Sequence, residues 1–440
     1  SGRAWRVLAA GALLVVLAVG AAAAGLIWRG QMSRPLPPLS PMAQADAGEA
    51  VLQRERGAYL ARAANCIGCH SRADQPVMAG GRPLATPFGT VTPGNLTPDA
   101  QAGLGAWRLE DFQRALHQGI SRDGRLLTPA FPYAHFSAMQ PEDVRDLYVW
   151  LRSLPATAVP AEPGTLRWPA NQAWAVALWR GLYFSPAVPL PAAQVAPGAA
   201  MRGAYLGQTL GHCGACHDSR NSLGAPRAGG TWAGETMPGL PWWAPSLRRE
   251  DQGGVQTWPQ AEVEALLRTG RSAHGRAAGP MAEVVAQSTQ YLSDGDLQAL
   301  AGWLRGLPVD AVPSRPAAVQ EPAAALAMRG EVLSPGARLY QQHCADCHGE
   351  QGEGDGPRYP ALAGNRLLAM APANNLVRSV IEGGFGASTT SQPRPHGMPP
   401  YGALLTDEEL AAVISHLRQT WGGAEPVDAV LVDRLRGGVR

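Results

Sequence analysis

The first strong pattern in the chain is an apolar run near its beginning. From Val7 to Trp28 no residue is charged, and about 20 apolar residues are enough for a helix to span a bilayer. Arg3 and Arg6 precede the run, which predicts that this side stays in the cytoplasm and that the body lies outside. An uncleaved anchor is favoured over a signal peptide, for which the segment "AAAAG" could provide the cleavage site.

Beyond the apolar run, the hydrophobic pattern repeats three times. Each unit begins near a "GAYL" or "GARL" segment and ends in a helix whose first turn is acidic, as in "PEDV", "SDGDL" and "TDEEL". Such starts are typical of capped helices. The expected organisation is an anchor (1–30), a proline-rich spacer (31–47), a first domain (48–158), a linker with a tryptophan-rich helix (159–195), a second domain (196–308), a linker (309–328), a third domain (329–423) and a C-terminal tail (424–440).

The linker after the first domain contains the segment "WPANQAWAVALWRGLYF". Its pattern predicts a short amphipathic helix. Three positions for this helix stay open: on the membrane surface, on a partner subunit, or packed between domains.

All 6 cysteines fall in three copies of the pattern C-x-x-C-H, namely "CIGCH", "CGACH" and "CADCH". This pattern is the attachment signature of c-type haem. Residues i, i+3 and i+4 share one face of a helical turn, so both thiols and the imidazole can meet the same porphyrin. Zinc and a redox dithiol are the alternatives. The expected thioether residues are Cys66, Cys69, Cys213, Cys216, Cys344 and Cys347, and the expected proximal iron ligands are His70, His217 and His348.

The composition agrees with a bound prosthetic group. Only 6% of residues are aromatic and 16% are charged, while Gly (52) and Pro (39) are plentiful. A domain of about 100 residues with this composition is short of apolar core, and a covalently held haem would supply a large rigid body to pack around. The net charge of +2 does not identify a partner, and no basic patch for nucleic acid is visible.

The second axial ligands are expected about eight to twelve residues before each closing helix. That position holds Met398 in the third unit and Met281 in the second. A methionine is often a core filler, but the flanking Gly and Pro and the repeated position favour iron ligation. A methionine ligand beside histidine raises the reduction potential of a haem.

The first unit departs from this pattern, because Phe131 occupies the methionine position and phenylalanine cannot bind iron. His135 lies in the same loop and is the preferred candidate for the sixth ligand. Met139 is the second choice; it directly precedes the helix cap, where a side chain usually packs on the helix. An open iron and His117 are the remaining possibilities. A haem with two histidine ligands should have a lower potential than its neighbours.

The body of the chain resembles the triheme cytochrome c subunit of membrane-bound periplasmic dehydrogenases. The matching segments include "TPFGTVTPGNLTPDAQAGLGAW" from Thr86, "GLPWWAPSL" from Gly239 and "GEGDGPRYPALAGN" from Gly352. The resemblance implies a mainly α fold of three tandem cytochrome c domains, a transmembrane helix and three covalent haem c groups. It also implies that the Pro360 carbonyl orients the imidazole of His348.

Within this family, the segment "PAFPYAHF" is more similar to the subunits that serve molybdenum hydroxylases, such as isoquinoline, nicotinate and membrane-bound aldehyde dehydrogenases. The resemblance therefore implies a molybdenum-cofactor catalytic subunit, a small iron–sulfur subunit, ubiquinone as acceptor and membrane lipid as partners. It places the chain at the bacterial inner membrane with its body in the periplasm. No residue of the chain is expected to be catalytic. The alternatives are the same role for a quinoprotein alcohol or flavin sugar dehydrogenase, and a free-standing electron carrier.

Overall fold

The computed structural model describes residues 2–39, 47–160, 162–311, 332–356 and 358–437. The end of the expected spacer (40–46) and most of the expected linker 309–328 lie outside these residues. The chain forms two compact units. The first comprises residues 1–61, 69–192 and 221–226, and the second comprises residues 62–68, 193–220 and 227–440.

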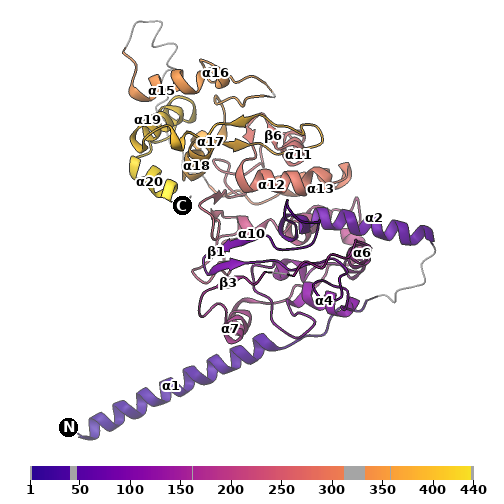
Figure 1. The fold of residues 1–440 in the computed structure, drawn as a ribbon. Coiled ribbons are helices and arrows are strands. Elements are labelled where there is room, and N and C mark those ends of the chain that lie inside the picture. Colours follow the sequence, from indigo (N-terminus) through magenta and orange to yellow (C-terminus); the bar gives the residue numbers. More distant parts are fainter. Residues whose placement is uncertain (1, 40–46, 161, 312–331, 357, 438–440) are drawn as a thin grey trace. The chain divides into compact units, whose positions relative to one another are not determined.

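Helices dominate the chain up to the end of the tryptophan-rich linker (Figure 1). The helices are α1 (Gly2–Gln31), α2 (Ala47–Ala63), α3 (Cys66–His70), α4 (Leu109–Gln118), α5 (Tyr133–Phe136), α6 (Pro141–Arg152) and α7 (Ala173–Tyr183). The strands are β1 (Leu84–Thr86), β2 (Gly89–Val91) and β3 (Thr165–Leu166). The helix expected in the tryptophan-rich linker is confirmed as α7.

The three strands form one small antiparallel sheet in the order β1-β2-β3. Leu84 pairs with Val91 across the first hairpin, and Gly89 pairs with Leu166. The third strand comes from the linker expected between the first and second domains. The beginning of that linker is therefore part of the first unit.

The chain from residue 192 onward has the same helical character. Its helices are α8 (Ala192–Val195), α9 (Arg202–Ala204), η1 (Tyr205–Leu210, a π-helix), α10 (Gly214–His217), α11 (Gln260–Thr269), α12 (Gly279–Gln287), η2 (Thr289–Tyr291), α13 (Asp294–Arg305), α15 (Pro335–His343), α16 (Ala345–His348), α17 (Arg366–Ala369), α18 (Asn374–Glu382), η3 (Tyr401–Ala403), α19 (Asp407–Leu417), η4 (Arg418–Gly422) and α20 (Ala429–Gly437). Its strands pair as hairpins, β4 (Glu235–Thr236) with β5 (Trp243–Ala244), β6 (Arg271–Ser272) with β7 (Gly275–Arg276), and β8 (Gly384–Phe385) with β9 (Gly397–Met398).

A glycine allows two helices to cross closely at three places in the chain. Gly57 lies against Asp146 and Trp150, Gly203 against Ala299 and Trp303, and Gly336 against Ala412 and His416. In each case an added Cβ would collide with the backbone carbonyl of the facing helix. A residue without a Cβ is therefore required at each crossing.

The closing helices begin where the acidic turns predicted. Ser293 and Thr406 accept hydrogen bonds from the backbone N–H groups of Asp296 and Glu409, so each caps its helix. The helix α6 starts with Pro141 after Gln140, whose side chain makes no cap bond. Proline is favoured at this position because its missing N–H would have no partner within the helix.

The second unit contains both the second and the third haem motif. Within it, the backbone N–H of Trp243 donates to the Asn375 side chain at 2.8 Å, and the Asn375 amide donates back to the Trp243 carbonyl at 2.7 Å. Ala387 joins a buried cluster with Ala277, Ala282 and Val285. These polar and apolar contacts tie the regions around the two motifs into one body.

The third region has an extended apolar core of its own. Tyr340, Leu410, Ile414 and Val432 are among its buried side chains, and Met398 packs against its edge. The helix α20, from the expected C-terminal tail, contributes Val432 to this core. The tail is therefore part of the folded unit as far as residue 437.

Candidate haem sites

The three C-x-x-C-H motifs all lie in short helical turns. Helix α3 spans the first motif, and the first cysteine of each of the other two motifs is the N-cap of α10 and α16. A helical turn puts residues i, i+3 and i+4 on one side. The local structure therefore has the arrangement that attachment of one porphyrin through two thioethers requires.

The six cysteines of the motifs share a similar environment. All six are half-buried. Burial raises the pKa of the Cys213 and Cys344 thiols to about 12, so both thiols are protonated at neutral pH. In the described part of the chain, no group of three or more His, Cys, Asp or Glu side chains could hold a metal ion.

Each proximal histidine is held by a backbone carbonyl from a distant segment. The Nδ1 atom of His70 donates to the Gly94 oxygen at 2.7 Å, that of His217 to the Pro245 oxygen at 2.8 Å, and that of His348 to the Pro360 oxygen at 2.9 Å. A carbonyl can only accept, so each Nδ1 carries the proton and Nε2 keeps its lone pair for a metal. The contact expected between Pro360 and His348 is confirmed.

A glycine completes the same arrangement at all three sites. The N–H groups of Gly80, Gly234 and Gly354 donate to the backbone carbonyls of His70, His217 and His348 at 2.8, 2.9 and 2.7 Å. These glycines have φ angles of 80°, 72° and 71°, which lie in the left-handed region that favours glycine.

The same glycines touch the carbonyl groups that orient the imidazoles. A Cβ on Gly80 would lie 2.6 Å from the Gly94 carbonyl carbon. The corresponding distances are 2.7 Å from Gly234 to Pro245 and 2.8 Å from Gly354 to Pro360. We call this set of histidine, glycine and carbonyl the proximal clamp. Each clamp fixes the backbone of its histidine and the direction of its ring together.

Sequence reasoning found one of the three carbonyls and none of the clamp glycines. The missed signal is a leucine two residues after each carbonyl: Leu96, Leu247 and Leu362. The glycines carry no such signal, because they follow their histidines by different numbers of residues in the three units. Only the folded chain brings them to equivalent places.

Burial controls the protonation state of the proximal histidines. Removal from water lowers the pKa of His70, His217 and His348, and the bond to each carbonyl partly opposes this effect. At neutral pH the imidazoles are therefore uncharged, which is the form that binds a metal.

The two expected methionine ligands occupy similar positions at the edges of apolar clusters. Met398 lies in β9, paired with β8, and is half-buried against the core of the third region. Met281 lies in the first turn of α12 and is half-buried against Ala277, Ala282 and Val285. Both side chains combine packing on one side with partial exposure on the other.

The first region has aromatic packing where the methionine is expected. The ring of Phe131 lies 5.7 Å from that of Phe136 and 6.4 Å from that of Tyr133. His135 belongs to the same short helix α5 as Tyr133 and Phe136, and it is half-buried. Met139 is 0% exposed and His117 is 2% exposed, so both are enclosed by protein atoms.

The sequence comparisons agree with this architecture. The cytochrome c family model matches residues 54–155 and 333–421. The cytochrome c subunit of alcohol dehydrogenase (quinone) from Gluconobacter oxydans is 35% identical over 401 residues, which cover 89% of this chain and 83% of that protein. The gluconate 2-dehydrogenase cytochrome c subunit of Pantoea cypripedii is 34% identical over 391 residues, covering 87% and 88%. A nicotinate dehydrogenase subunit of Pseudomonas putida is 34% identical over 416 residues, covering 93% of this chain but 33% of that protein.

The motifs and the family match define a mainly helical protein with cytochrome c domains, which carry covalently bound haem c. The chain belongs to the family of cytochrome c subunits of dehydrogenases. Its class of function is therefore electron transfer within an oxidoreductase complex.

Proposed function

We propose that this chain carries three haem c groups and passes electrons from a molybdenum and iron–sulfur catalytic part, which oxidises an aldehyde, to ubiquinone in the membrane. The observation that carries the haem count is the proximal clamp, which recurs with the same contacts at His70, His217 and His348. Each clamp would hold one haem between its histidine and a second ligand, for which Met281 and Met398 are the candidates in the second and third regions.

For the first haem we propose His135 as the sixth ligand. Met139 directly precedes the N-cap of α6, as Leu292 and Leu405 precede the caps of α13 and α19, and all three are buried core side chains. A ligand must present its donor atom to the haem, and a methionine enclosed on all sides by protein cannot do so without repacking. The half-buried His135 meets this requirement better than Met139 or His117.

When bound, each haem would supply a one-electron centre that cycles between ferric and ferrous iron. The residues of the chain do the rest. The carbonyls of Gly94, Pro245 and Pro360 hold the Nδ1 protons and fix the ring orientations, and the buried surroundings keep the imidazoles neutral. Methionine ligands at the second and third haems, with a histidine ligand at the first, would give the first haem the lowest potential.

Two observations support the molybdenum-dependent partner. The chain has Phe131 at the expected methionine position, which resembles the subunits of molybdenum hydroxylases. The match to the nicotinate dehydrogenase subunit covers 93% of this chain. The second candidate is a quinoprotein alcohol dehydrogenase or a flavin sugar dehydrogenase, favoured by the matches to alcohol and gluconate dehydrogenase subunits along most of their lengths.

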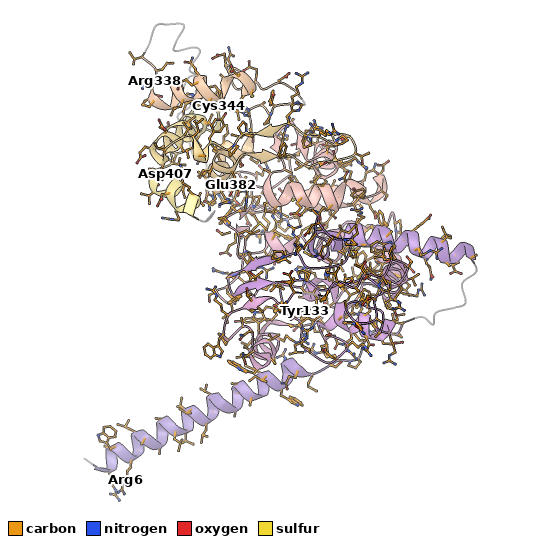
Figure 2. The ribbon with its side chains drawn as sticks, in the orientation of Figure 1. Arg6, Tyr133, Arg338, Cys344, Glu382 and Asp407 are labelled. Atoms are coloured by element: carbon orange, nitrogen blue, oxygen red, sulfur yellow. The ribbon has the colours of Figure 1, made fainter. Side chains whose placement is uncertain are left out.

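We further propose that α1 anchors the chain in the bacterial inner membrane with its body in the periplasm. Residues 3–31 form a helix that is long and apolar enough to cross a membrane, and none of its most apolar window is buried by protein. Arg6 lies near the N-terminal end of this helix (Figure 2), where a cytoplasmic flank is expected to be basic.

The test is metal and cofactor analysis of the complex purified through this subunit in mild detergent. Three haems per chain, with molybdenum and non-haem iron in the same fraction, would support the aldehyde-oxidising partner and justify screening with aldehydes. Pyrroloquinoline quinone or flavin without molybdenum would overturn it in favour of the second candidate. A stable, isolated monomer would favour the free-standing carrier.

A further inference from the structure

The tryptophan-rich helix α7 packs directly on the last turns of the apolar helix α1. Figure 1 shows α7 beside the C-terminal end of α1. A Cβ on Gly30 would collide with the Ala177 carbonyl, and a Cβ on Gly181 would collide with the Leu26 carbonyl. Each helix therefore contributes a glycine to the crossing, and the backbones are in close contact at two neighbouring points.

A network of hydrogen bonds fixes this crossing to the rest of the first unit. The Nε atom of Arg180 donates to the Gly30 carbonyl at 2.8 Å, and its Nη1 donates to the Gln118 carbonyl. The Gln118 side chain accepts from the Ser33 hydroxyl at 3.0 Å and donates to the Arg34 carbonyl at 2.7 Å. The segment just after α1 is therefore bound to α4 and α7 and does not act as a loose tether.

The exposed surface of α7, beside its contact with α1, is apolar. Trp174 and Leu182 are 44% and 47% exposed, and Leu178 lies between them at a spacing of four residues, half-buried. Arg180 is the one charged residue of α7, and it is 3% exposed because it points into the unit. Exposed tryptophans flank the crossing, with Trp168 before α7 and Trp28 on α1.

The depth of α7 follows from the position of α1. The uncharged run from Val7 to Trp28 has 22 residues, and about 20 are needed to span the hydrocarbon layer. Trp28 then lies at the outer boundary of that layer, where tryptophan is enriched. Gly181 touches Leu26, two residues before Trp28, so α7 is held at the depth of the lipid headgroups.

We propose that α7 lies in the outer surface of the bilayer as a second, in-plane lipid contact of this chain, with Trp174, Leu178 and Leu182 facing the acyl chains. The occupant of this surface is the phospholipid bilayer itself, because the surface is continuous with the exposed side of α1. An apolar face at this depth gains free energy by entering the acyl boundary. The inference rests on the proposed anchoring by α1.

The contact would also couple the bilayer to the first haem region. Phe184 directly follows α7, and its ring meets that of Tyr133 edge-on at 4.9 Å. Tyr133 and His135 belong to the same short helix α5. The helix that touches lipid is thus one side-chain contact away from the proposed ligand loop of the first haem.

Photo-crosslinking in native membranes tests the proposal on the full chain. The variants Trp174→p-benzoylphenylalanine and Leu182→p-benzoylphenylalanine place a probe that inserts into nearby C–H bonds on α7. Leu14→p-benzoylphenylalanine places the same probe in the middle of α1, and Leu52→p-benzoylphenylalanine places it on the exposed surface of α2, away from α1 (Figure 1). Each variant must first be shown to contain as much haem as the parent protein. If only one of the two α7 variants meets this condition, that variant alone is sufficient for the test.

We expect lipid adducts from positions 174 and 182, detected by mass spectrometry, at a yield at least about tenfold above that at position 52. Lipid adducts at 14 without adducts at 174 and 182 would overturn the proposal while leaving the anchor in place. A crosslink from 174 or 182 to another polypeptide would assign the surface to a partner subunit and also overturn it. If position 14 gives no lipid adducts either, the anchoring itself is wrong.

Discussion

The first and third haem regions share the same proximal clamp and glycine crossing. They differ in the loop that precedes the closing helix. Both have a proximal clamp and a helix crossing at a glycine, Gly57 in the first region and Gly336 in the third. The third region has Met398 before its closing helix, whereas the first has Phe131 packed among aromatic rings. We propose that the constant parts hold the proximal side of a haem. The variable parts would then adjust the potential of that haem and the stability of its region without disturbing attachment.

The largest expected effect concerns the sixth ligands. The double variant Phe131→Met/His135→Ala should give the first region a histidine–methionine haem and raise its potential by ~0.1–0.3 V, equivalent to about 2–7 kcal/mol at 2.3 kcal/mol per 0.1 V. Met398→His should lower the potential of the third haem by a similar amount. Spectroelectrochemical titration of the full chain measures both changes.

The matched control for the first region is Met139→Leu, which keeps an apolar side chain at the position before the helix cap. Its expected effect on the potential is small. A large shift from Met139→Leu, with none from His135→Ala, would reverse the ligand assignment.

The next largest effect concerns the helix crossings. Gly336→Ala should destabilise the third region by about 3 kcal/mol or more, because the new Cβ meets backbone atoms that cannot move aside. Gly57→Ala should do the same in the first region. Urea denaturation followed by circular dichroism measures the change.

Gly302→Ala is the control for the crossing variants, since Gly302 is an exposed residue of α13 with nothing within 4 Å of an added Cβ. It should be neutral or stabilise by up to about 1 kcal/mol through helix propensity. Equal destabilisation by Gly302→Ala and Gly336→Ala would remove the crossing as the explanation.

A smaller effect distinguishes the rings at the crossings. Trp150 takes this position in the first region, and His416 takes it in the third. Burial lowers the pKa of His416 from 6.5 to about 4, so the unfolded chain binds more protons between these pH values. The stabilisation is complete above pH 6.5 and is lost as the pH falls towards 4, by about 1–3 kcal/mol.

The variant His416→Phe should remove this part of the acid sensitivity. The test compares the free energies of unfolding of the variant and the parent at pH 7 and pH 4.5. The buried His117, whose pKa is also lowered to about 4, is present in both proteins and cancels. An unchanged pH dependence would mean that folding does not lower the pKa of His416.

The smallest effect concerns the caps of the closing helices. In the third region Thr406 and Glu409 form a capping box, with the Glu409 side chain accepting from the Thr406 N–H at 2.9 Å. Thr406→Ala should cost about 1 kcal/mol of stability, whereas Thr406→Ser should be nearly neutral. Thermal unfolding of the two variants gives the comparison, and equal losses would show that the methyl group matters more than the hydroxyl.

The sequence by itself determined the features that depend on neighbouring residues. The cysteines and histidine of each haem motif lie within one helical turn, so their spacing is sufficient to predict their chemistry. The starts of α13 and α19 were predictable for the same reason, because a cap acts on N–H groups two or three residues away, and α6 starts at a local proline and acidic turn. The apolar run of α1 likewise needs no information beyond its own composition.

Only the tertiary structure decided which distant segments meet. The carbonyls that orient His70 and His217 lie 24 and 28 residues away, and no spacing rule connects them. The Pro360 carbonyl of His348, 12 residues away, was the one expected beforehand. The packing of α7 on α1 and the joining of the second and third haem regions in one unit are of the same kind. Such contacts form because surfaces from remote parts of the chain fit together, and this fit depends on backbone geometry that the order of residues does not display.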